Sequence, residues 1–374
     1  MSVILLILGL LLFVGLVVAH EFGHFIVARR NGVEVEEFGI GFPPKIWSKK
    51  TKKGFLFSIN LLPLGGFVRL KGEHDADIEP GTFGASSTWV KTKIMVAGVG
   101  MNLLVALIFF TILAWLGMPQ LISNQFSIKS DSKVIKNEVL VGTVQNNSPA
   151  AKAGLHPRDQ LLDIASGSNI KYVSKANGLP NITEYFAGKS VTITYLRNGQ
   201  THSANMTLVS TKEVQASLKT NNSKGYLGVA PTEYTLQRST WSAPIVALGI
   251  TKQFTVLTFK GLWTAITSLL HGNTAAASSQ VSGPVGIFVL LKDGSLLGYQ
   301  LTLMIVAIVS LSLAIMNVLP IPALDGGHLF VTYISRILKK PVAQNVEDWV
   351  YGVSFVFLLG LVALITVVDV KRFF

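Results

Sequence analysis

Two histidines and a glutamate lie at the end of an apolar run near the start of the chain. Residues 17–30 are VVAHEFGHFIVARR, in which His20, Glu21 and His24 form the pattern H-E-x-x-H. On a helix, residues four apart lie on the same side, about 6 Å apart along the axis. Both imidazoles can therefore reach one Zn²⁺. The chain contains no cysteine, so thiolate ligands are excluded.

A structural alternative is a pair of buried, hydrogen-bonded histidines beside a glutamate whose carboxylate is also satisfied. Residues 1–19 carry no charged side chain, so the motif would lie at the end of a membrane span. A carboxylate inside a span costs about 2.5–3.5 kcal/mol on insertion scales, and a divalent cation would supply the missing counter-charge. The motif therefore favours a metal site.

Catalytic zinc usually has three protein ligands and one open position, so a third ligand must come from elsewhere in the chain. Asp325 lies in NVLPIPALDGGH, residues 317–328, directly after an apolar run. Pro320 and Pro322 cannot continue a helix, and Asp-Gly-Gly at 325–327 is typical of a tight turn. We expect a broken helix end that presents Asp325 at membrane depth. An ordinary loop turn just outside the membrane is the alternative.

The elements that must position these residues are predicted to be membrane spans. Hydrophobic residues make up 49% of the chain and charged residues 14%, against about 25% in globular proteins. Four apolar runs approach the ~20 residues that a bilayer requires, at 1–19, 94–118, 301–319 and 350–368. Lys252 and Lys260 interrupt a weaker run at 241–270, which we expect to be an interfacial amphipathic segment rather than a fifth span.

The cations gather in two segments of the chain. Those between the first two spans are Arg29, Arg30, Lys45, Lys49, Lys50, Lys52, Lys53, Arg69, Lys71, Lys91 and Lys93, and those after the third are Arg336, Lys339 and Lys340. The positive-inside rule predicts that both segments are cytoplasmic, and that the termini and residues 120–298 lie outside. The net charge of +12 does not indicate a nucleic-acid partner, because base-stacking aromatic residues do not alternate with these cations.

The two chemical motifs resemble those of the site-2 protease family of intramembrane zinc metalloproteases, in its bacterial regulator-of-sigma-E protease branch. Residues 20–24 match the family's H-E-x-x-H, and residues 317–326 match its N-x-x-P-x-P-x-L-D-G. Residues 98–102, GVGMN, resemble its G-x-x-x-N. The resemblance covers most of the chain and implies one Zn²⁺ per chain, held by His20, His24 and Asp325.

The resemblance also implies a membrane-re-entrant β-hairpin near the catalytic centre. Residues 54–71, GFLFSINLLPLGGFVRLK, are expected to form two short strands around Pro63, Gly65 and Gly66. An extended substrate could pair with the edge of this hairpin by strand addition. A cytosolic hairpin against the membrane surface is the alternative.

Outside the membrane, residues 141–164 resemble the core of a PDZ domain, and one such core is visible. We expect a short helix that begins at Ser148-Pro149-Ala150 and ends at Gly154-Leu155, followed by a strand at 160–164. A second strand is predicted at 191–195, before an Asn198-Gly199 turn. Arg158 occupies a turn position where glycine is common in this motif. Such a domain binds peptide ends by strand addition or filters substrates by size.

The predicted fold is therefore an α-helical polytopic membrane protein of about four transmembrane helices, with a re-entrant β-hairpin and an inserted extracytoplasmic α+β PDZ domain. Its predicted segments are helix 1 at 1–30, a cytoplasmic loop at 31–92 with the hairpin at 54–71, helix 2 at 93–118, the PDZ domain at 122–234, an interfacial segment at 235–298, helix 3 with a following helix at 299–340, and helix 4 at 349–369. We expect it in the bacterial cytoplasmic membrane, with the PDZ domain and both termini outside and the catalytic site toward the cytoplasm.

The predicted activity is hydrolysis of peptide bonds in or beside the span of single-span membrane proteins, such as anti-sigma factors or signal-peptide remnants. Glu21 would take a proton from the attacking water and return it to the leaving amine. Predicted substrate-binding residues are Asn317, Asn102, Gly65 and Gly66. His328 is expected to be structural, because a fourth protein ligand would close the water position.

Two other functional classes have different sequence signatures. A secondary transporter would have broken spans in corresponding halves, whereas this sequence has one Pro-broken span and no internal repeat. A membrane-tethered PDZ scaffold with a vestigial metal site is not excluded by the sequence, because intact ligands do not establish turnover. The predicted partners are membrane-protein substrates, the lipid bilayer and an unspecified PDZ peptide ligand.

Overall fold

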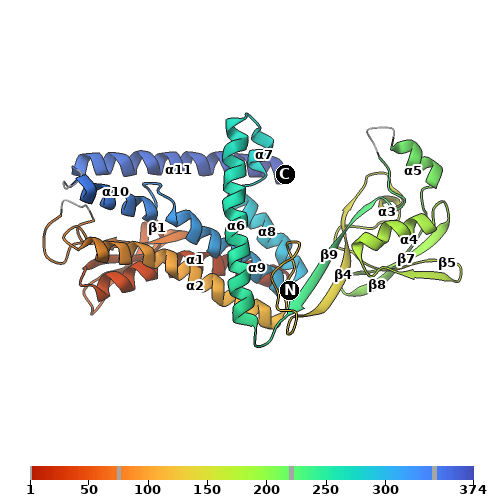
Figure 1. Cartoon of the computed structure of the whole chain (residues 1–374), viewed down its shortest axis with the longest axis horizontal. Coiled ribbons are helices and arrows are strands. Elements are labelled where there is room, and N and C mark those ends of the chain that lie inside the picture. Colours follow the sequence, from red (N-terminus) through yellow and green to blue (C-terminus); the bar gives the residue numbers. More distant parts are fainter. Residues whose placement is uncertain (1, 74–76, 219–222, 339–342) are drawn as a thin grey trace. The chain divides into compact units, whose positions relative to one another are not determined.

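The computed structural model describes residues 2–73, 77–218, 223–338 and 343–374 (Figure 1). The chain divides into a helical unit, formed by residues up to Met118 with 124–128 and 239–374, and a β-rich unit of residues 119–123 and 129–238. The β-rich unit is thus an insertion between helices of the first unit. Two of the predicted cytoplasmic cations, Lys339 and Lys340, lie outside the described residues.

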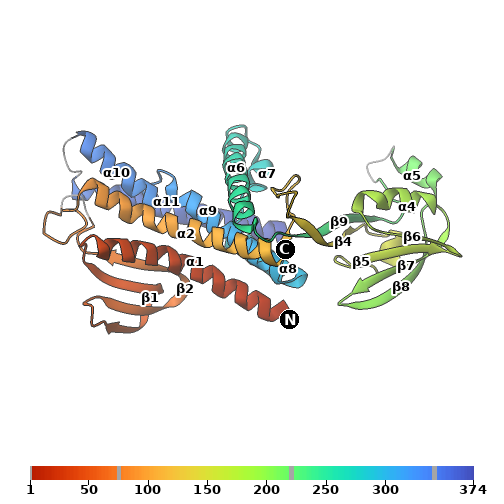
Figure 2. The ribbon, with the colours of Figure 1, turned by 60° about the horizontal axis from the view of Figure 1, so that its bottom comes forward.

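Five helices of the helical unit are long and apolar enough to cross a membrane: α1 (Ser2–Arg30), α2 (Thr88–Leu116), α6 (Ala243–Leu270), α9 (Tyr299–Val318) and α11 (Gln344–Phe373). By length and composition this is one more than the four predicted spans. Lys252 and Lys260 interrupt the apolar sequence of α6 without interrupting its helix. In both views α6 runs across the direction that the other four share (Figures 1 and 2).

Helix α2 lies at the centre of the helical unit and packs against α1, α6, α9 and α10. It begins after Ser87, whose hydroxyl accepts a hydrogen bond from the Val90 N–H as an N-cap. Its side chains Ile94, Phe110 and Leu113 are fully buried. Because α2 touches both α1 and α10, it is the element against which the two predicted metal-binding motifs are held.

Two shorter helices, α7 (Thr274–Ser278) and α8 (Pro284–Leu297), precede α9. The chain then turns sharply between α9 and α10 (Asp325–Leu338). Asp325 is the first residue of α10, so the prediction of a tight turn at residues 325–327 was wrong. The turn lies at residues 322–324, and the two glycines belong to the first helical turn. A Cβ on Gly326 would collide with the Val318 carbonyl, and one on Gly327 with the Ile321 carbonyl. These glycines therefore allow close backbone packing rather than a turn conformation.

Strands β1 (Val35–Lys50) and β2 (Leu56–Leu70) form a small sheet against α1 (Figure 2). Residues 35–40 pair on one side with 66–70, and residues 37–40 pair on the other side with 56–59, while 45–50 pair with 56–60. The prediction of a hairpin confined to residues 54–71 was therefore wrong. Residues 56–70 are one bent strand whose partner precedes it, because strand pairing is decided by tertiary contacts that one segment's pattern does not specify. No other described strand pairs with residues 66–70, which form an edge of the sheet.

The β-rich unit is built on one antiparallel sheet. Its strands follow the order β3 (Met118–Pro119), β9 (Val229–Arg238), β4 (Lys133–Val144), β5 (Gln160–Ser166), β7 (Ser190–Arg197) and β8 (Gln200–Thr207), with β6 (Asn169–Tyr172) paired to β5. Helices α3 (Pro149–Lys152), α4 (Leu179–Tyr185) and α5 (Thr211–Ser217) and a 3₁₀ turn at Ala176–Gly178 accompany the sheet. Its core includes Leu161, Ile164, Phe186 and Ile193.

The local predictions for this unit are confirmed. Ser148 caps α3 by accepting a hydrogen bond from the Ala151 N–H, and the predicted strands fall within β5 and β7. Asn198 and Gly199 both have positive φ, as a two-residue hairpin turn requires. Arg158 also has a φ of +76°, which explains why glycine is common at this position.

Candidate metal centre

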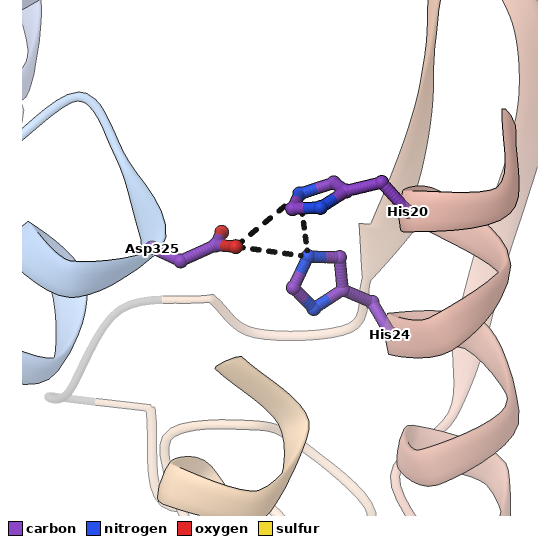
Figure 3. A group of neighbouring side chains, drawn as sticks. All are labelled: His20, His24 and Asp325. Atoms are coloured by element: carbon purple, nitrogen blue, oxygen red, sulfur yellow. Dashed lines mark hydrogen bonds and ion pairs between the residues drawn. The ribbon is translucent and has the colours of Figure 1, made fainter. Parts of the chain in front are cut away.

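Three side-chain atoms from two distant segments meet at one point. The Nε2 atoms of His20 and His24 are 3.2 Å apart, and Asp325 Oδ2 lies 3.2 Å from the first and 3.3 Å from the second (Figure 3). Tetrahedral zinc with bonds of about 2.0–2.1 Å separates its ligand atoms by about 3.3–3.4 Å. The triangle therefore has the size that one zinc ion requires.

The surroundings of these atoms also fit a cation. His20 and His24 are 8% and 7% exposed, and buried Asp325 Oδ2 has no hydrogen-bond donor among the described residues. When both Nε2 atoms are unprotonated, three electron pairs point at one another in a site shielded from solvent. A bound cation would satisfy all three atoms at once.

The two histidines are placed by α1 and backed by α2. Their i, i+4 spacing turns both rings to the side of α1 that faces α2. A Cβ on Gly98 of α2 would collide with the His24 ring and lie 2.6 Å from His20 Cε1. Gly23 of α1 likewise lies so close to α2 that its Cβ would be 2.5 Å from the Ala97 carbonyl oxygen. Glycine on both helices thus permits the approach that the site needs.

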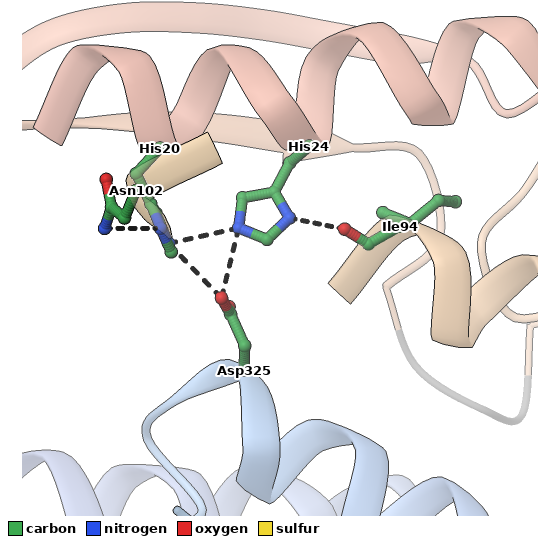
Figure 4. Close-up of polar contacts among 5 residues, drawn as sticks. All are labelled: His20, His24, Ile94, Asn102 and Asp325. Carbon is green, nitrogen blue, oxygen red and sulfur yellow. Dashed lines mark hydrogen bonds and ion pairs between the residues drawn. The ribbon is translucent and has the colours of Figure 1, made fainter. Parts of the chain in front are cut away.

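The other ring nitrogen of each histidine contacts α2. The Nδ1 of His24 lies 2.7 Å from the Ile94 carbonyl oxygen, and that of His20 lies 3.3 Å from the Asn102 side-chain nitrogen (Figure 4). Ile94, Gly98 and Asn102 are four residues apart and so share one face of α2. Sequence reasoning missed the Ile94 carbonyl, because a main-chain acceptor leaves no signature in the residue type.

Glu21 lies beside the three predicted ligands. It lines a cavity of about 160 Å³ together with His24, Asp325, His328 and Val68, among other residues. A Cβ on Gly66 of β2 would lie 3.4 Å from Glu21 Cγ, so the edge of the sheet comes directly against this carboxylate. The arrangement leaves space next to the ligand triangle for a water molecule and a peptide carbonyl.

The four predicted substrate-binding residues lie in different surroundings. Gly66 lies against the Glu21 side chain at Cγ, whereas a Cβ on Gly65 would meet the Phe42 ring. Asn102 contacts His20 and is 1% exposed. Asn317 is half-buried in the last turn of α9, and its side chain has no hydrogen-bond partner among the described residues.

His328 does not join the ligand triangle. Its ring stacks on Tyr351 of α11 with centroids 4.2 Å apart, and the Tyr351 hydroxyl donates a hydrogen bond of 3.2 Å to Glu347. Glu347 lies in the first turn of α11 and is only 3% exposed. The i, i+4 spacing of Glu347 and Tyr351 is the signal that could have indicated this pair.

Comparison with known proteins finds relatives that are named proteases and match nearly the whole chain. A protein of Clostridium perfringens named "Putative zinc metalloprotease" is 31% identical over 373 residues, with 98% of each chain covered. The "Regulator of sigma-W protease RasP" of Bacillus subtilis is 27% identical with 98% of each chain covered. "Probable protease eep" of Enterococcus faecalis is 26% identical, with 96% of this chain and 97% of its own covered.

The family match extends over nearly all of the chain. Residues 8–361 fit the model of peptidase family M50, a range that contains both H-E-x-x-H and the Asp325 segment. The same range contains the inserted β-rich unit. The chain therefore belongs to peptidase family M50.

Proposed function

We propose that this protein is an intramembrane zinc metalloprotease that hydrolyses peptide bonds in or near the span of single-span membrane proteins. The observation that carries the proposal is the triangle of His20, His24 and Asp325 with Glu21 beside it. The five apolar helices and the sheet edge at Gly66 support a substrate that reaches the site from the bilayer.

In this mechanism His20, His24 and Asp325 would hold one Zn²⁺. The ion would lower the pKa of a water molecule toward ~7 and polarise the scissile carbonyl. Glu21 accepts the proton as the water oxygen bonds to the carbonyl carbon, and then gives it to the amide nitrogen as the C–N bond breaks. The carboxylate suits this role because it lines the same cavity as His24 and Asp325.

The sheet edge at residues 66–70 supplies a binding mode for the substrate backbone. A transmembrane helix hides its carbonyls in i to i−4 hydrogen bonds, so it must unwind before it can be cut. The extended segment could then pair with the unpaired edge of β2 by strand addition. Gly66, Gly65 and Asn317 would lie along this segment.

The β-rich unit is proposed to be a PDZ domain on the extracytoplasmic side. A cavity of about 120 Å³ is lined by Leu179, Pro180 and Thr183 of α4 and by residues 225–229 at the start of β9. A groove between a helix and a strand is the place where such domains bind a peptide end. The groove supports capture of a substrate or partner terminus more directly than a purely steric filter.

The proposed location is the bacterial cytoplasmic membrane, with the catalytic site toward the cytoplasm. The cations that flank α1 and β1 support this orientation. One relative is named a regulator of sigma-W protease, which supports an anti-sigma factor as one substrate class, beside signal-peptide remnants.

The decisive experiment compares three purified proteins in detergent: wild type, Glu21→Gln, and Glu79→Gln as a control at an exposed glutamate. Each is incubated with a panel of single-span substrates, and bound zinc is measured in each. We expect cleavage by wild type and control, a loss of about 100-fold or more in Glu21→Gln, and about one zinc per chain in all three. Zinc binding without cleavage of any substrate would favour a scaffold, and absence of zinc would overturn the metal site.

A further inference from the structure

The two histidines of the metal centre differ in the partner of their second nitrogen. His24 Nδ1 faces the Ile94 carbonyl oxygen at 2.7 Å. A carbonyl oxygen can only accept a hydrogen bond, so this Nδ1 must be the donor. His20 Nδ1 faces the Asn102 Nδ2 at 3.3 Å, which is a donor. The Asn102 Oδ1 has no hydrogen-bond partner among the described residues, although Asn102 is only 1% exposed.

This difference decides which nitrogen can bind a metal. A neutral imidazole carries one proton, so an Nδ1 that accepts a hydrogen bond leaves the proton on Nε2. That Nε2 then has no free electron pair for a ligand bond. His24 is already held in the tautomer that frees Nε2, whereas His20 requires an acceptor at its Nδ1.

We propose that Asn102 is a positioning residue for zinc, with its Oδ1 accepting a hydrogen bond from the His20 Nδ1–H. The proposal rests on the metal site of the proposed function. A half-turn of the amide exchanges Oδ1 and Nδ2 with almost no change of shape. The turned amide gives Oδ1 the donor that it lacks and leaves the His20 Nε2 free to bind the ion.

The position of Asn102 supports this role over direct contact with substrate. Asn102 is four residues beyond Gly98 and eight beyond Ile94, so the three lie on the face of α2 that backs the histidines. Figure 4 shows Asn102 beside His20 and Ile94 beside His24. The Ser310 hydroxyl of α9 donates a hydrogen bond of 2.8 Å to the Asn102 main-chain carbonyl, which fixes this part of α2 against α9. Asn102 is not among the residues that line the cavity at Glu21.

The test measures zinc affinity by chelator competition in full-length protein carrying Glu21→Gln, so that proteolysis does not enter the readout. The variants are Asn102→Leu, which removes the acceptor at similar size, and Asn102→Asp, which keeps an acceptor whichever way the group turns. Gly100→Ala is the control, since a Cβ there meets nothing within 4 Å. Thermal unfolding of the metal-free proteins checks that each variant folds.

We expect zinc affinity to fall about 10- to 100-fold in Asn102→Leu, as for other outer-shell partners of ligand histidines, and to be largely retained in Asn102→Asp. In cobalt-substituted protein, the d–d absorption should be weaker in Asn102→Leu than in Asn102→Asp. Unchanged zinc affinity in Asn102→Leu would overturn the proposal, as would an equal loss in a folded Asn102→Asp. If the Glu21→Gln parent binds no zinc, the proposed function itself fails before Asn102 is tested.

Discussion

The backbone of Gly98 on α2 lies directly against the His24 ring on α1, so close that a single added methyl group would collide with Nε2. The atom that it would strike is one of the three that form the proposed metal site. A residue without a side chain is therefore part of the metal centre, because it decides whether the imidazoles can occupy their positions.

Gly98→Ala is expected to lower zinc affinity by about 100-fold or more, at or beyond the upper end seen for outer-shell changes, and to remove proteolysis. The methyl group meets both imidazoles, so either the rings or α2 must shift and the ligand triangle is lost. The measurement is zinc content and substrate cleavage of the purified variant. Gly100→Ala, two residues away on the same helix, should keep both, and normal zinc binding by Gly98→Ala would refute the packing argument.

Gly326→Ala is expected to displace Asp325. Its Cβ would strike the main chain at Val318 and Leu319, which cannot move as a flexible side chain would. We expect loss of bound zinc with the helical content largely kept, measured by zinc analysis and circular dichroism. Gly352→Ala on α11, where a Cβ meets nothing within 4 Å, is the control and should retain zinc. Equal zinc in both variants would mean that the first turn of α10 is not constrained as described.

Arg158→Gly is expected to stabilise the β-rich unit. A non-glycine residue in the left-handed region destabilises the folded state by about 1–2 kcal/mol. Glycine removes this strain but offsets about 0.5–1 kcal/mol of the gain, because it loses more conformational entropy on folding. The net gain of about 0.5–1 kcal/mol should slow hydrogen exchange of the β5 and β7 amides by about two- to five-fold. Arg158→Ala removes the same side chain but keeps the strain, so it should not slow exchange; a similar gain in both variants would contradict the explanation.

Glu37→Gln is expected to change how the free energy of unfolding depends on pH. Burial by itself raises the pKa of Glu37, but hydrogen bonds from Lys45 and Ser58 and the Arg69 charge bring it below the ordinary value. A lowered folded-state pKa gives stability that is present above the unfolded pKa of about 4.3 and lost as pH falls through the folded value.

The measurement for Glu37 is thermal unfolding of the metal-free full chain between neutral and acidic pH. Wild type should lose more stability than Glu37→Gln as the pH falls below about 4.3, because only wild type has this carboxylate to protonate. Glu36→Gln, at an exposed neighbour, should follow wild type. Parallel curves for wild type and Glu37→Gln would show that the Lys45 and Ser58 contacts do not stabilise the ionised carboxylate.

Short-range features of the chain were predictable because they depend on residue spacing. His20 and His24 share a helix face through their i, i+4 separation, and Pro320 and Pro322 end α9 before Asp325. The Asn198-Gly199 turn follows from two residues that accept positive φ. The helix break at Pro320 and Pro322 singled out Asp325 as a candidate third ligand. Nothing local specifies that it meets the histidines, and the family resemblance supplied that pairing.

What only the tertiary structure decided are contacts between segments whose own patterns do not specify a partner. Strand β2 pairs with β1 rather than folding on itself, because apolar alternation sets a face but not the neighbour that covers it. The Ile94 carbonyl, the Gly98 backbone and the Asn102 amide become part of the metal centre only when α2 packs against α1. The sequence by itself determined which side chains could bind zinc, and the packing of α2 decided how their rings are held.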